Sequence, residues 1–387
     1  MKILMVSWSI LPRAGGSSVI VESLAQNFKR DELIVLGGSP VLGRKPFPRP
    51  ATSPEFIYFA SDFSLGGRGE RFFQFIRQWR FRPLVEKIKR IIVEEKIDYV
   101  IGVYPVISFC LAACRAARES GVPFSSYFHN TYVENTNIRN PKAAEIQKEI
   151  FDHSQRVFVM SKGMQAFYEE KYPGHHFVPL VHTFNEYPDD TALSGVPGVG
   201  KSRYELVAIG NFNESNLEAT RRLSDTIAAD DRYRLNVYTH VPKLLLQKRG
   251  VNIKAVEHQG FLRPDQVHAA LQQYDIAVLT HGFTGGYGEV EYRTIFPTRT
   301  IPLLLSGKPI LAHSPPGSFL NDFIRENACA ELVETPTEAA VREGLDRIAS
   351  DEAYQRQLVA AARKTAELFY GPNVVRLLQD TLTAAQV

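Results

Sequence analysis

Short, uninterrupted apolar runs that alternate with helical patterns leave few folds open to this chain. Residues 2–7, Lys-Ile-Leu-Met-Val-Ser, form the first such run, and residues 33–37 form the second. Runs without polar alternation are typical of strands buried on both faces of a sheet. Between the two runs, apolar side chains recur at helical spacing up to residue 28, after the candidate N-caps Ser17 and Ser18. This β-loop-α-β opening predicts a parallel, doubly wound sheet.

The same rhythm continues along the chain and is interrupted once. Residues 187–202 are rich in Pro and Gly and predict a linker, and a chain of 387 residues is too long for one ordinary core. We therefore expect an α/β protein with two Rossmann-like, doubly wound domains facing a cleft. The first spans residues 1–187, the second spans residues 188–369, and a final helix at about residues 370–387 packs back on the first. Ligands of such sheets bind at the carboxyl ends of the strands. The further strands are expected at residues 98–103, 123–128, 157–160, 205–209, 234–238, 256–260, 275–280 and 308–312, and the further helices at residues 106–120, 141–153, 161–172, 217–227, 265–273, 319–326 and from 337 onward.

Composition argues against several classes of protein. The formal net charge of +3 is small for this length and does not indicate a nucleic-acid binder. The first strand begins at residue 2, without room for a charged leader, and no window approaches the roughly 18–20 apolar residues of a membrane-spanning helix. Cys110, Cys114 and Cys329 lie in apolar patterns without zinc-ligand spacing. We expect a cytoplasmic protein with reduced cysteines and no bound metal.

Residues 275–309 are the strongest candidate for a binding site. A buried-strand pattern at residues 275–280 precedes four glycines within residues 282–288, and Thr294, Thr298 and Arg299 lead into an apolar helical run that ends at Gly307. Free N–H groups at a helix start, hydroxyls and a cation favour a phosphate. The alternative is an ordinary loop followed by a helix.

Several segments in order resemble a nucleotide-sugar glycosyltransferase of the GT-B fold, closest to the retaining family 4. The resemblance spans nearly the whole chain. It is carried by residues 1–6 with 14–16, 156–164, 260–268, 274–279 and 296–312.

The resemblance implies a set of donor-site residues. Thr298 and Arg299 would bind the diphosphate, the backbone around Phe296 would approach the sugar, and Gly15 and Gly16 would close over the diphosphate. His129, directly after the strand at residues 123–128, would be the catalytic histidine that positions the sugar and stabilises an oxocarbenium-like transition state. The alternative for His129 is a half-buried histidine bonded to backbone.

The sequence also departs from this family. Two glutamates that many members use for the sugar and the ribose are replaced by Thr294 and Pro302. Glu289 or Glu291 would then contact the donor sugar, or the donor is held differently. Asn211 and Asn213 stand where an Arg and a Lys are usual, so Arg299 would be the main cation, and His281 at the end of its strand is a further donor contact.

A basic and aromatic stretch at residues 68–90 has two interpretations. Arg71, Arg77, Arg80 and Arg82 with interleaved aromatic residues form either a patch for anionic lipid or an anionic acceptor, or the solvated face of an amphipathic helix.

Together these features predict a glycosyltransferase that moves a sugar from a nucleoside diphosphate sugar to an acceptor hydroxyl of a glycan, a lipid-linked sugar or a polysaccharide precursor. Retention is implied by the resemblance, and the missing Asp-x-Asp motif predicts metal independence. The donor is a co-substrate, so no cofactor is expected. The partners are the donor and the acceptor, together with an anionic membrane surface at the inner face if the basic stretch is a lipid patch. The alternatives are a nucleotide-sugar epimerase of the same fold and a catalytically silent nucleotide-binding protein.

Overall fold

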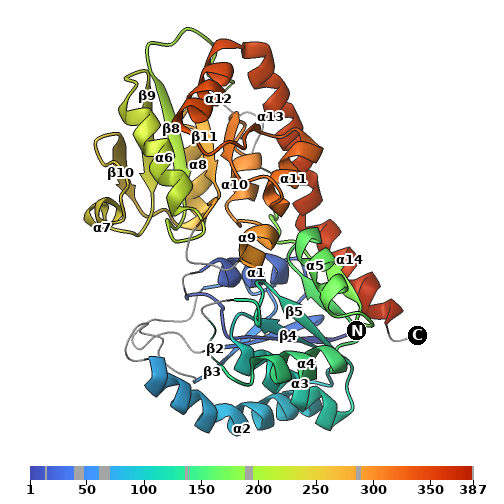
Figure 1. Ribbon diagram of the computed structural model, residues 1–387. Helices are drawn as coiled ribbons and strands as arrows, with labels where there is room; N and C mark the ends of the chain where they lie inside the picture. Colours follow the sequence, from blue (N-terminus) through green and yellow to red (C-terminus); the bar gives the residue numbers. More distant parts are fainter. Residues whose placement is uncertain are drawn as a thin grey trace. The chain divides into compact units, whose positions relative to one another are not determined.

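The computed structural model describes residues 1–13, 15–38, 48–60, 70–135, 138, 140–187, 195–284 and 289–385, with the backbone alone for residues 70–78 and 264. The chain divides into two compact units (Figure 1). The N-terminal unit comprises Met1–Asn185 and Phe369–Val387, and the C-terminal unit comprises Glu186–Leu368.

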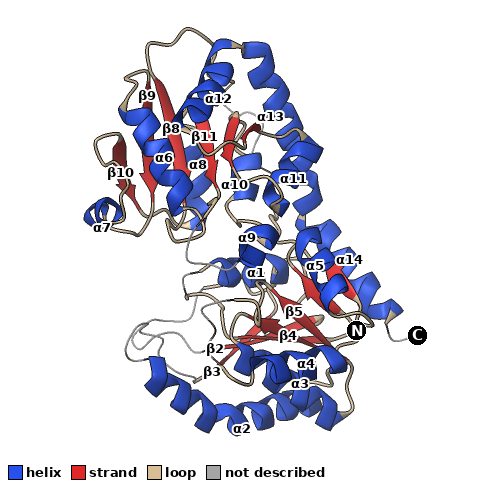
Figure 2. Ribbon diagram, viewed as in Figure 1, coloured by secondary structure: helices blue, strands red, loops and turns tan. Residues whose placement is uncertain are grey.

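The N-terminal unit is built on a parallel sheet of seven strands in the order β3-β2-β1-β4-β5-β6-β7 (Figure 2). The order reverses between β1 and β4, which is the topological switch point of a doubly wound sheet. Its strands are β1 (Ile3–Ser7), β2 (Leu33–Gly38), β3 (Glu55–Phe59), β4 (Tyr99–Tyr104), β5 (Phe124–Phe128), β6 (Val157–Val159) and β7 (Phe177–Pro179). Its helices are α1 (Gly16–Ala25), α2 (Glu70–Glu94), α3 (Ile107–Ser120), α4 (Ala143–His153), α5 (Lys162–Lys171) and α14 (Gly371–Ala384).

The C-terminal unit repeats this plan with six parallel strands in the order β10-β9-β8-β11-β12-β13. Its switch point lies between β8 and β11, so the exits of these two strands are where a ligand is expected. The strands are β8 (Tyr204–Ile209), β9 (Tyr233–Tyr238), β10 (Val256–Gly260), β11 (Ile276–Thr280), β12 (Ile310–His313) and β13 (Glu331–Val333). The helices are α6 (Leu217–Ala228), α7 (Lys243–Lys248), η3 (Pro264–Gln266), α8 (Val267–Leu271), α9 (Glu289–Thr294), α10 (Thr300–Leu304), α11 (Phe319–Asn327), α12 (Glu338–Ser350), α13 (Glu352–Ala366) and η4 (Glu367–Phe369), whose last residue belongs to the N-terminal unit.

Continuous apolar runs form the central strands because both faces of each sheet are covered. In β1, Leu4 and Val6 pack with residues of α2, α3 and α4, whereas Ile3 and Met5 pack with residues of α1 and α14. Each fully buried side chain of this kind stabilises the fold by roughly 1.5–3 kcal/mol relative to an exposed one. The expected two α/β sheets are confirmed.

Three short strands and the two short helices α7 and α9 were not expected from the sequence, whereas α10 lies where a helix was expected but is shorter. Strand β3 is only partly buried, and β7 and β13 have three residues each, so none has a distinctive pattern. The helices α7, α9 and α10 have six, six and five residues. The helix expected after Arg299 is therefore a little more than one turn, too short to contribute a strong dipole.

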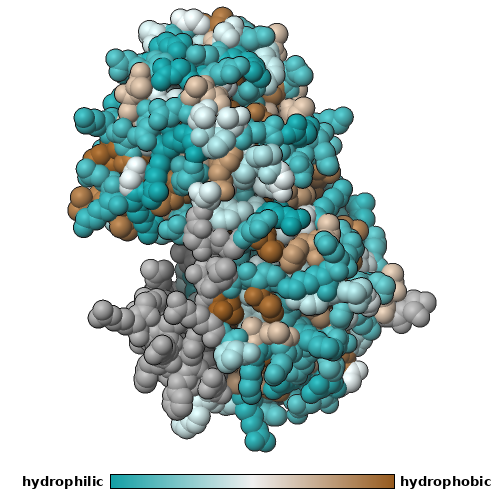
Figure 3. Space-filling model, in the orientation of Figure 1, coloured by the Kyte–Doolittle hydropathy of each residue, from teal (hydrophilic) through white to brown (hydrophobic). Residues whose placement is uncertain are grey.

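No helix among the described residues is long and apolar enough to cross a membrane. The face drawn in Figure 3 is mostly hydrophilic, with single apolar residues scattered over it.

Candidate functional site

Arg299 occupies the switch point of the C-terminal unit. The residue is the N-cap of α10, and its Nη2 donates to the carbonyl oxygen of Thr280, the last residue of β11, at 2.7 Å. Across the switch point, Gly210 follows β8 with φ 109°. A Cβ on Gly210 would lie 3.5 Å from Arg299 Cδ and 3.6 Å from Nη1, so glycine leaves room for the guanidinium to lie against the backbone.

The guanidinium is half-buried, and burial lowers the pKa of Arg299 to about 10. No ion pair joins it to a carboxylate among the described residues. A cation removed from water without an acidic partner is costly, and an anion bound beside it would offset that cost.

The neighbours of Arg299 add polar groups to the same edge. Thr298 is exposed, whereas Thr300 is buried and its hydroxyl has no hydrogen-bond partner within the described chain. Asn211 is exposed beyond the end of β8, and its carbonyl accepts from the side chain of Asn216 at 2.9 Å. Arg299, Thr298 and Asn211 are thus found at the carboxyl edge, as predicted; whether they bind a diphosphate stays a prediction.

Two side chains near α9 that were predicted to contact the donor, His281 and Thr294, already form hydrogen bonds within the protein. His281 is 1% exposed and its Nε2 donates to the carbonyl of Tyr292 at 2.9 Å. Thr294 is buried and its hydroxyl donates to the carbonyl of Val290 at 2.8 Å. Glu289 is exposed and Glu291 is buried. The ring of His281 therefore fixes α9. Because the ring is almost fully buried, it exposes little surface that a donor could contact.

Phe296 has a core role that the sequence did not reveal. Its ring lies 4.9 Å from that of Phe323 and 5.7 Å from that of Phe319, centroid to centroid, both on α11. Its side chain is 6% exposed, so only its backbone stays a candidate for the donor.

The glycine pair of the N-terminal unit opens α1. Gly15 is the N-cap with φ 150°, a conformation that favours glycine, and no side chain caps the helix. Both Gly15 and Gly16 are exposed, so the first N–H groups of α1 face an open surface.

His129 follows β5 and is 7% exposed, yet neither ring nitrogen has a hydrogen-bond partner among the described residues. Its ring packs edge-on against Tyr127, with centroids 4.3 Å apart. Burial, and to a lesser degree His182, lowers the pKa of His129 to about 3, so the ring is neutral near pH 7. A neutral imidazole offers one donor and one acceptor, which suits a hydroxyl-bearing ligand. The alternative of a half-buried histidine bonded to backbone is therefore wrong for its side chain.

The basic stretch lies on α2. The side chains of Arg71 and Arg77 lie outside the described residues. Arg80 is half-buried, with its guanidinium carbon 5.2 Å from the ring centroid of Phe59, and Arg82 is exposed. Trp79, which directly precedes Arg80, is 82% exposed.

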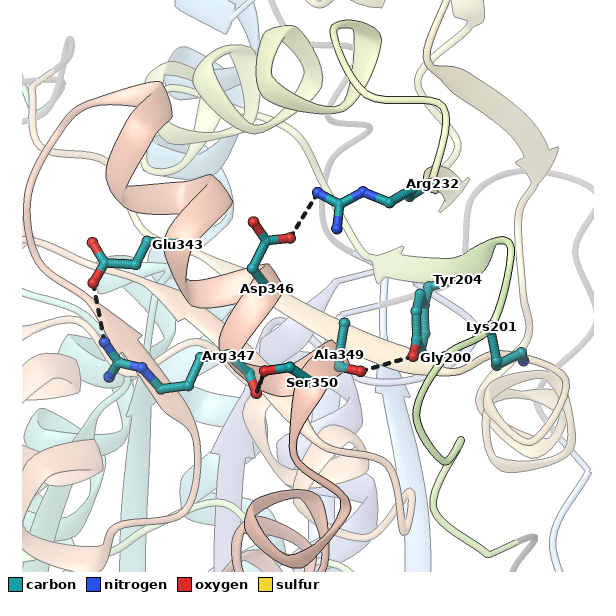
Figure 4. Close-up of a pocket in the computed structure, with 9 residues that line it drawn as sticks. All are labelled: Gly200, Lys201, Tyr204, Arg232, Glu343, Asp346, Arg347, Ala349 and Ser350. Carbon is teal, nitrogen blue, oxygen red and sulfur yellow. Dashed lines mark hydrogen bonds and ion pairs between the residues drawn. The ribbon is translucent and has the colours of Figure 1, made fainter.

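A cavity of about 590 Å³ lies elsewhere in the C-terminal unit, near the amino ends of β8 and β9 (Figure 4). Its cations are each paired: Arg232 with Asp346 at 2.8 Å, Arg347 with Glu343 at 3.4 Å, and Lys201 with Asp275 at 2.6 Å. These charges are already neutralised, and the cavity lies at the amino ends of the strands, whereas ligands of such sheets bind at the carboxyl ends. We therefore do not assign the cavity to the candidate site.

The structure also reveals residues that the sequence did not single out. Arg222 and Glu218 on α6, His313 at the end of β12 and Phe283 after β11 form one contact network. The i, i+4 spacing of Glu218 and Arg222 and the place of His313 at a strand end were the available signals. Within the described chain, no group of three or more His, Cys, Asp or Glu residues could hold a metal ion.

Comparison with known proteins finds one family model that matches part of the chain. Residues 14–186 match the model of Glycosyltransferase Family 4. No curated protein sequence matches the chain significantly.

Solved structures match over nearly the whole chain. Sucrose-phosphate synthase from Thermosynechococcus elongatus has 14% identity, with 99% of this chain and 98% of that chain covered and a TM-score of 0.72. HepE of Anabaena, in complex with UDP and glucose, has 13% identity, 99% coverage of both chains and a TM-score of 0.68. A glycosyltransferase from Rickettsia africae has 12% identity, 99% and 97% coverage and a TM-score of 0.65. At such identities the likeness establishes the GT-B fold, and with the family match it confirms the expected class of enzyme.

Proposed function

We propose that this GT-B glycosyltransferase, whose residues 14–186 match the model of Glycosyltransferase Family 4, transfers a sugar from a nucleoside diphosphate sugar to an acceptor hydroxyl. The acceptor class is a glycan, a lipid-linked sugar or a polysaccharide precursor. The donor is a co-substrate, so the proposal includes no cofactor.

The observation that carries this proposal is Arg299. A half-buried guanidinium without an acidic partner among the described residues, at the switch point of the C-terminal sheet, is suited to the diphosphate of the donor. Its planar fork can pair two phosphate oxygens while Nη2 stays on the carbonyl of Thr280. HepE, a structural neighbour, has been solved with UDP and with UDP-glucose, which supports a nucleoside diphosphate as the ligand class.

His129 is our candidate for the sugar side of the reaction. As a neutral, buried imidazole it would accept from, or donate to, a sugar hydroxyl and support developing positive charge at the anomeric carbon. The first turn of α1, entered through Gly15, would donate N–H groups to the diphosphate.

We further propose retention at the anomeric carbon and metal independence. The leaving diphosphate would be stabilised by Arg299 and by N–H and hydroxyl donors, including Thr298, in place of a divalent cation. Activity that persists in excess EDTA, with product of unchanged anomeric configuration by NMR, is the expected result.

Peripheral contact with an anionic membrane is the third part of the proposal. Trp79 is 82% exposed on α2, and Arg82, three residues later on the same helix, is also exposed. An exposed tryptophan beside cations suits the interface of a bilayer. Co-sedimentation with phosphatidylglycerol vesicles, weakened in W79A, is expected; no binding to these vesicles would exclude it.

The activity is tested in two steps. A thermal-shift screen over UDP, GDP and ADP identifies the base, because a ligand that binds the native state raises the melting temperature. Turnover of the matching nucleotide sugars is then followed with and without an acceptor panel. Acceptor-dependent transfer is expected, whereas turnover of the donor alone into an isomeric nucleotide sugar would indicate an epimerase instead.

A further inference from the structure

The exit of β11 is held at Thr280, Gly282 and Phe283 by the segment that precedes α6 and by the first turns of that helix. The hydroxyl of Thr280 lies 3.0 Å from that of Thr220, and the N–H of Gly282 donates to the carbonyl of Ser215 at 2.7 Å. The N–H of Phe283 donates to Glu218 Oε2 at 3.2 Å. The same stretch accepts Arg299 at the carbonyl of Thr280.

Arg222 connects this exit to β12, the strand next to β11, and through β12 to β13. Its Nη2 pairs with Glu218 Oε1, and its Nη1 lies 2.8 Å from His313 Nε2. His313 is fully buried, and its Nδ1 lies 2.9 Å from the carbonyl of Val333 in β13. A carbonyl can only accept, so Nδ1 carries the proton and Nε2 accepts from Arg222. One chain of hydrogen bonds therefore runs from β13 through His313, Arg222 and Glu218 to the N–H of Phe283.

The ring of Phe283 closes the network from the other side. Its centroid lies 4.7 Å from that of His313, and the guanidinium carbon of Arg222 lies 5.2 Å from it. Phe283 is thus fixed by a backbone hydrogen bond to Glu218 and by contacts of its ring. Arg222 supports both, because it pairs with Glu218 and also contacts the ring of Phe283.

We infer that Arg222 and His313 are positioning residues of the donor site: they fix the exit of β11, and through Thr280 they fix Arg299. The inference rests on the proposed function, because it assigns a role to residues that do not touch the donor themselves. Arg222 differs in this respect from its neighbour Arg221, whose Nε donates to the carbonyl of Arg249 away from the exit of β11.

The test compares Arg222→Met with Arg221→Met, which removes the same charge one residue earlier on the same helix. Two quantities are measured on the full chain: the hydrogen-exchange rate of the amides at residues 282–283 without ligand, and the dissociation constant for UDP, or for whichever nucleoside diphosphate gives the largest thermal shift. In R222M we expect exchange at these amides to accelerate at least about tenfold and the dissociation constant to rise by about tenfold. R221M should leave both unchanged.

His313→Asn is the second variant, since its amide can still donate to the carbonyl of Val333 but offers Arg222 no matching acceptor. It is expected to show the same two effects in a folded protein. Faster exchange with an unchanged dissociation constant in both variants would show that the network stabilises the fold without positioning the site, and would overturn the inference. Failure of the proposed function is recognised separately, because Arg299→Met would then also leave nucleotide affinity unchanged.

Discussion

Acid should destabilise the C-terminal unit through two buried histidines, His281 and His313. Burial lowers the pKa of each from 6.5 to about 4, because each ring is enclosed and faces a cation, Arg299 or Arg222. A histidine whose pKa is lower in the folded state than in the unfolded state stabilises the fold at pH values above its unfolded-state pKa. As the pH falls from 6.5 to 4, the unfolded chain takes up protons first, so stability is lost in this window.

The size of the effect follows from the two shifts. A difference of about 2.5 pH units corresponds to roughly 3 kcal/mol per histidine when the pH has fallen below the folded value. Between pH 6 and 4.5 each ring should contribute a slope of about 1.0–1.2 kcal/mol per pH unit to the free energy of unfolding, because the unfolded and folded rings differ by nearly one bound proton. Replacing His313 by Gln should therefore reduce the slope by about that amount.

The assay is urea unfolding at a series of pH values, followed by circular dichroism. Trp8 and Trp79 are the two tryptophans of the chain and both belong to the N-terminal unit, so tryptophan fluorescence follows that unit separately. The exposed His240→Gln is the matched control. If H313Q keeps the wild-type slope, His313 is not a buried neutral ring and the tautomer argument fails.

Three other substitutions test separate parts of the structure. His129→Phe removes two buried ring nitrogens without partners among the described residues, so thermal unfolding should shift little or upward while sugar transfer falls by about 100-fold; a large loss of stability would contradict the site assignment. Arg49→Met leaves the buried carboxylate of Glu22 without its bidentate partner and should cost about 3 kcal/mol in urea unfolding, with partial recovery when Glu22→Gln is added. Gly15→Ala must adopt φ 150° and should destabilise the N-terminal unit by about 1 kcal/mol or more by fluorescence; an unchanged midpoint would show that the loop relaxes.

The fold was readable from the sequence wherever strands are buried on both faces. The runs at β1, β4 and β11 have no polar interruption, and glycines and prolines mark the linker. Strand β3 was missed because it is half-exposed, and β7 and β13 because three residues carry no period.

The site was predictable only in part. Arg299 could be placed because it stands between a strand, a glycine-rich loop and an apolar run. The aromatic packing of Phe296 against α11 and the bond from His281 to Tyr292 join segments whose contact no local pattern reveals. The network of Arg222 and His313 unites α6, β12 and β13, which only the folded sheet brings together.

In the proposed function, Arg299 holds the diphosphate of the donor. Isothermal titration of UDP, or of the nucleoside diphosphate preferred in the thermal-shift screen, into Arg299→Met is compared with Arg293→Met, which removes an exposed arginine from α9. Loss of charge-assisted hydrogen bonds to phosphate should weaken binding by about 1.5–3 kcal/mol, or roughly 10- to 150-fold, in R299M, with little change in R293M. Equal affinities of R299M and the wild type, in a protein that is folded by circular dichroism, would show that Arg299 does not bind the diphosphate.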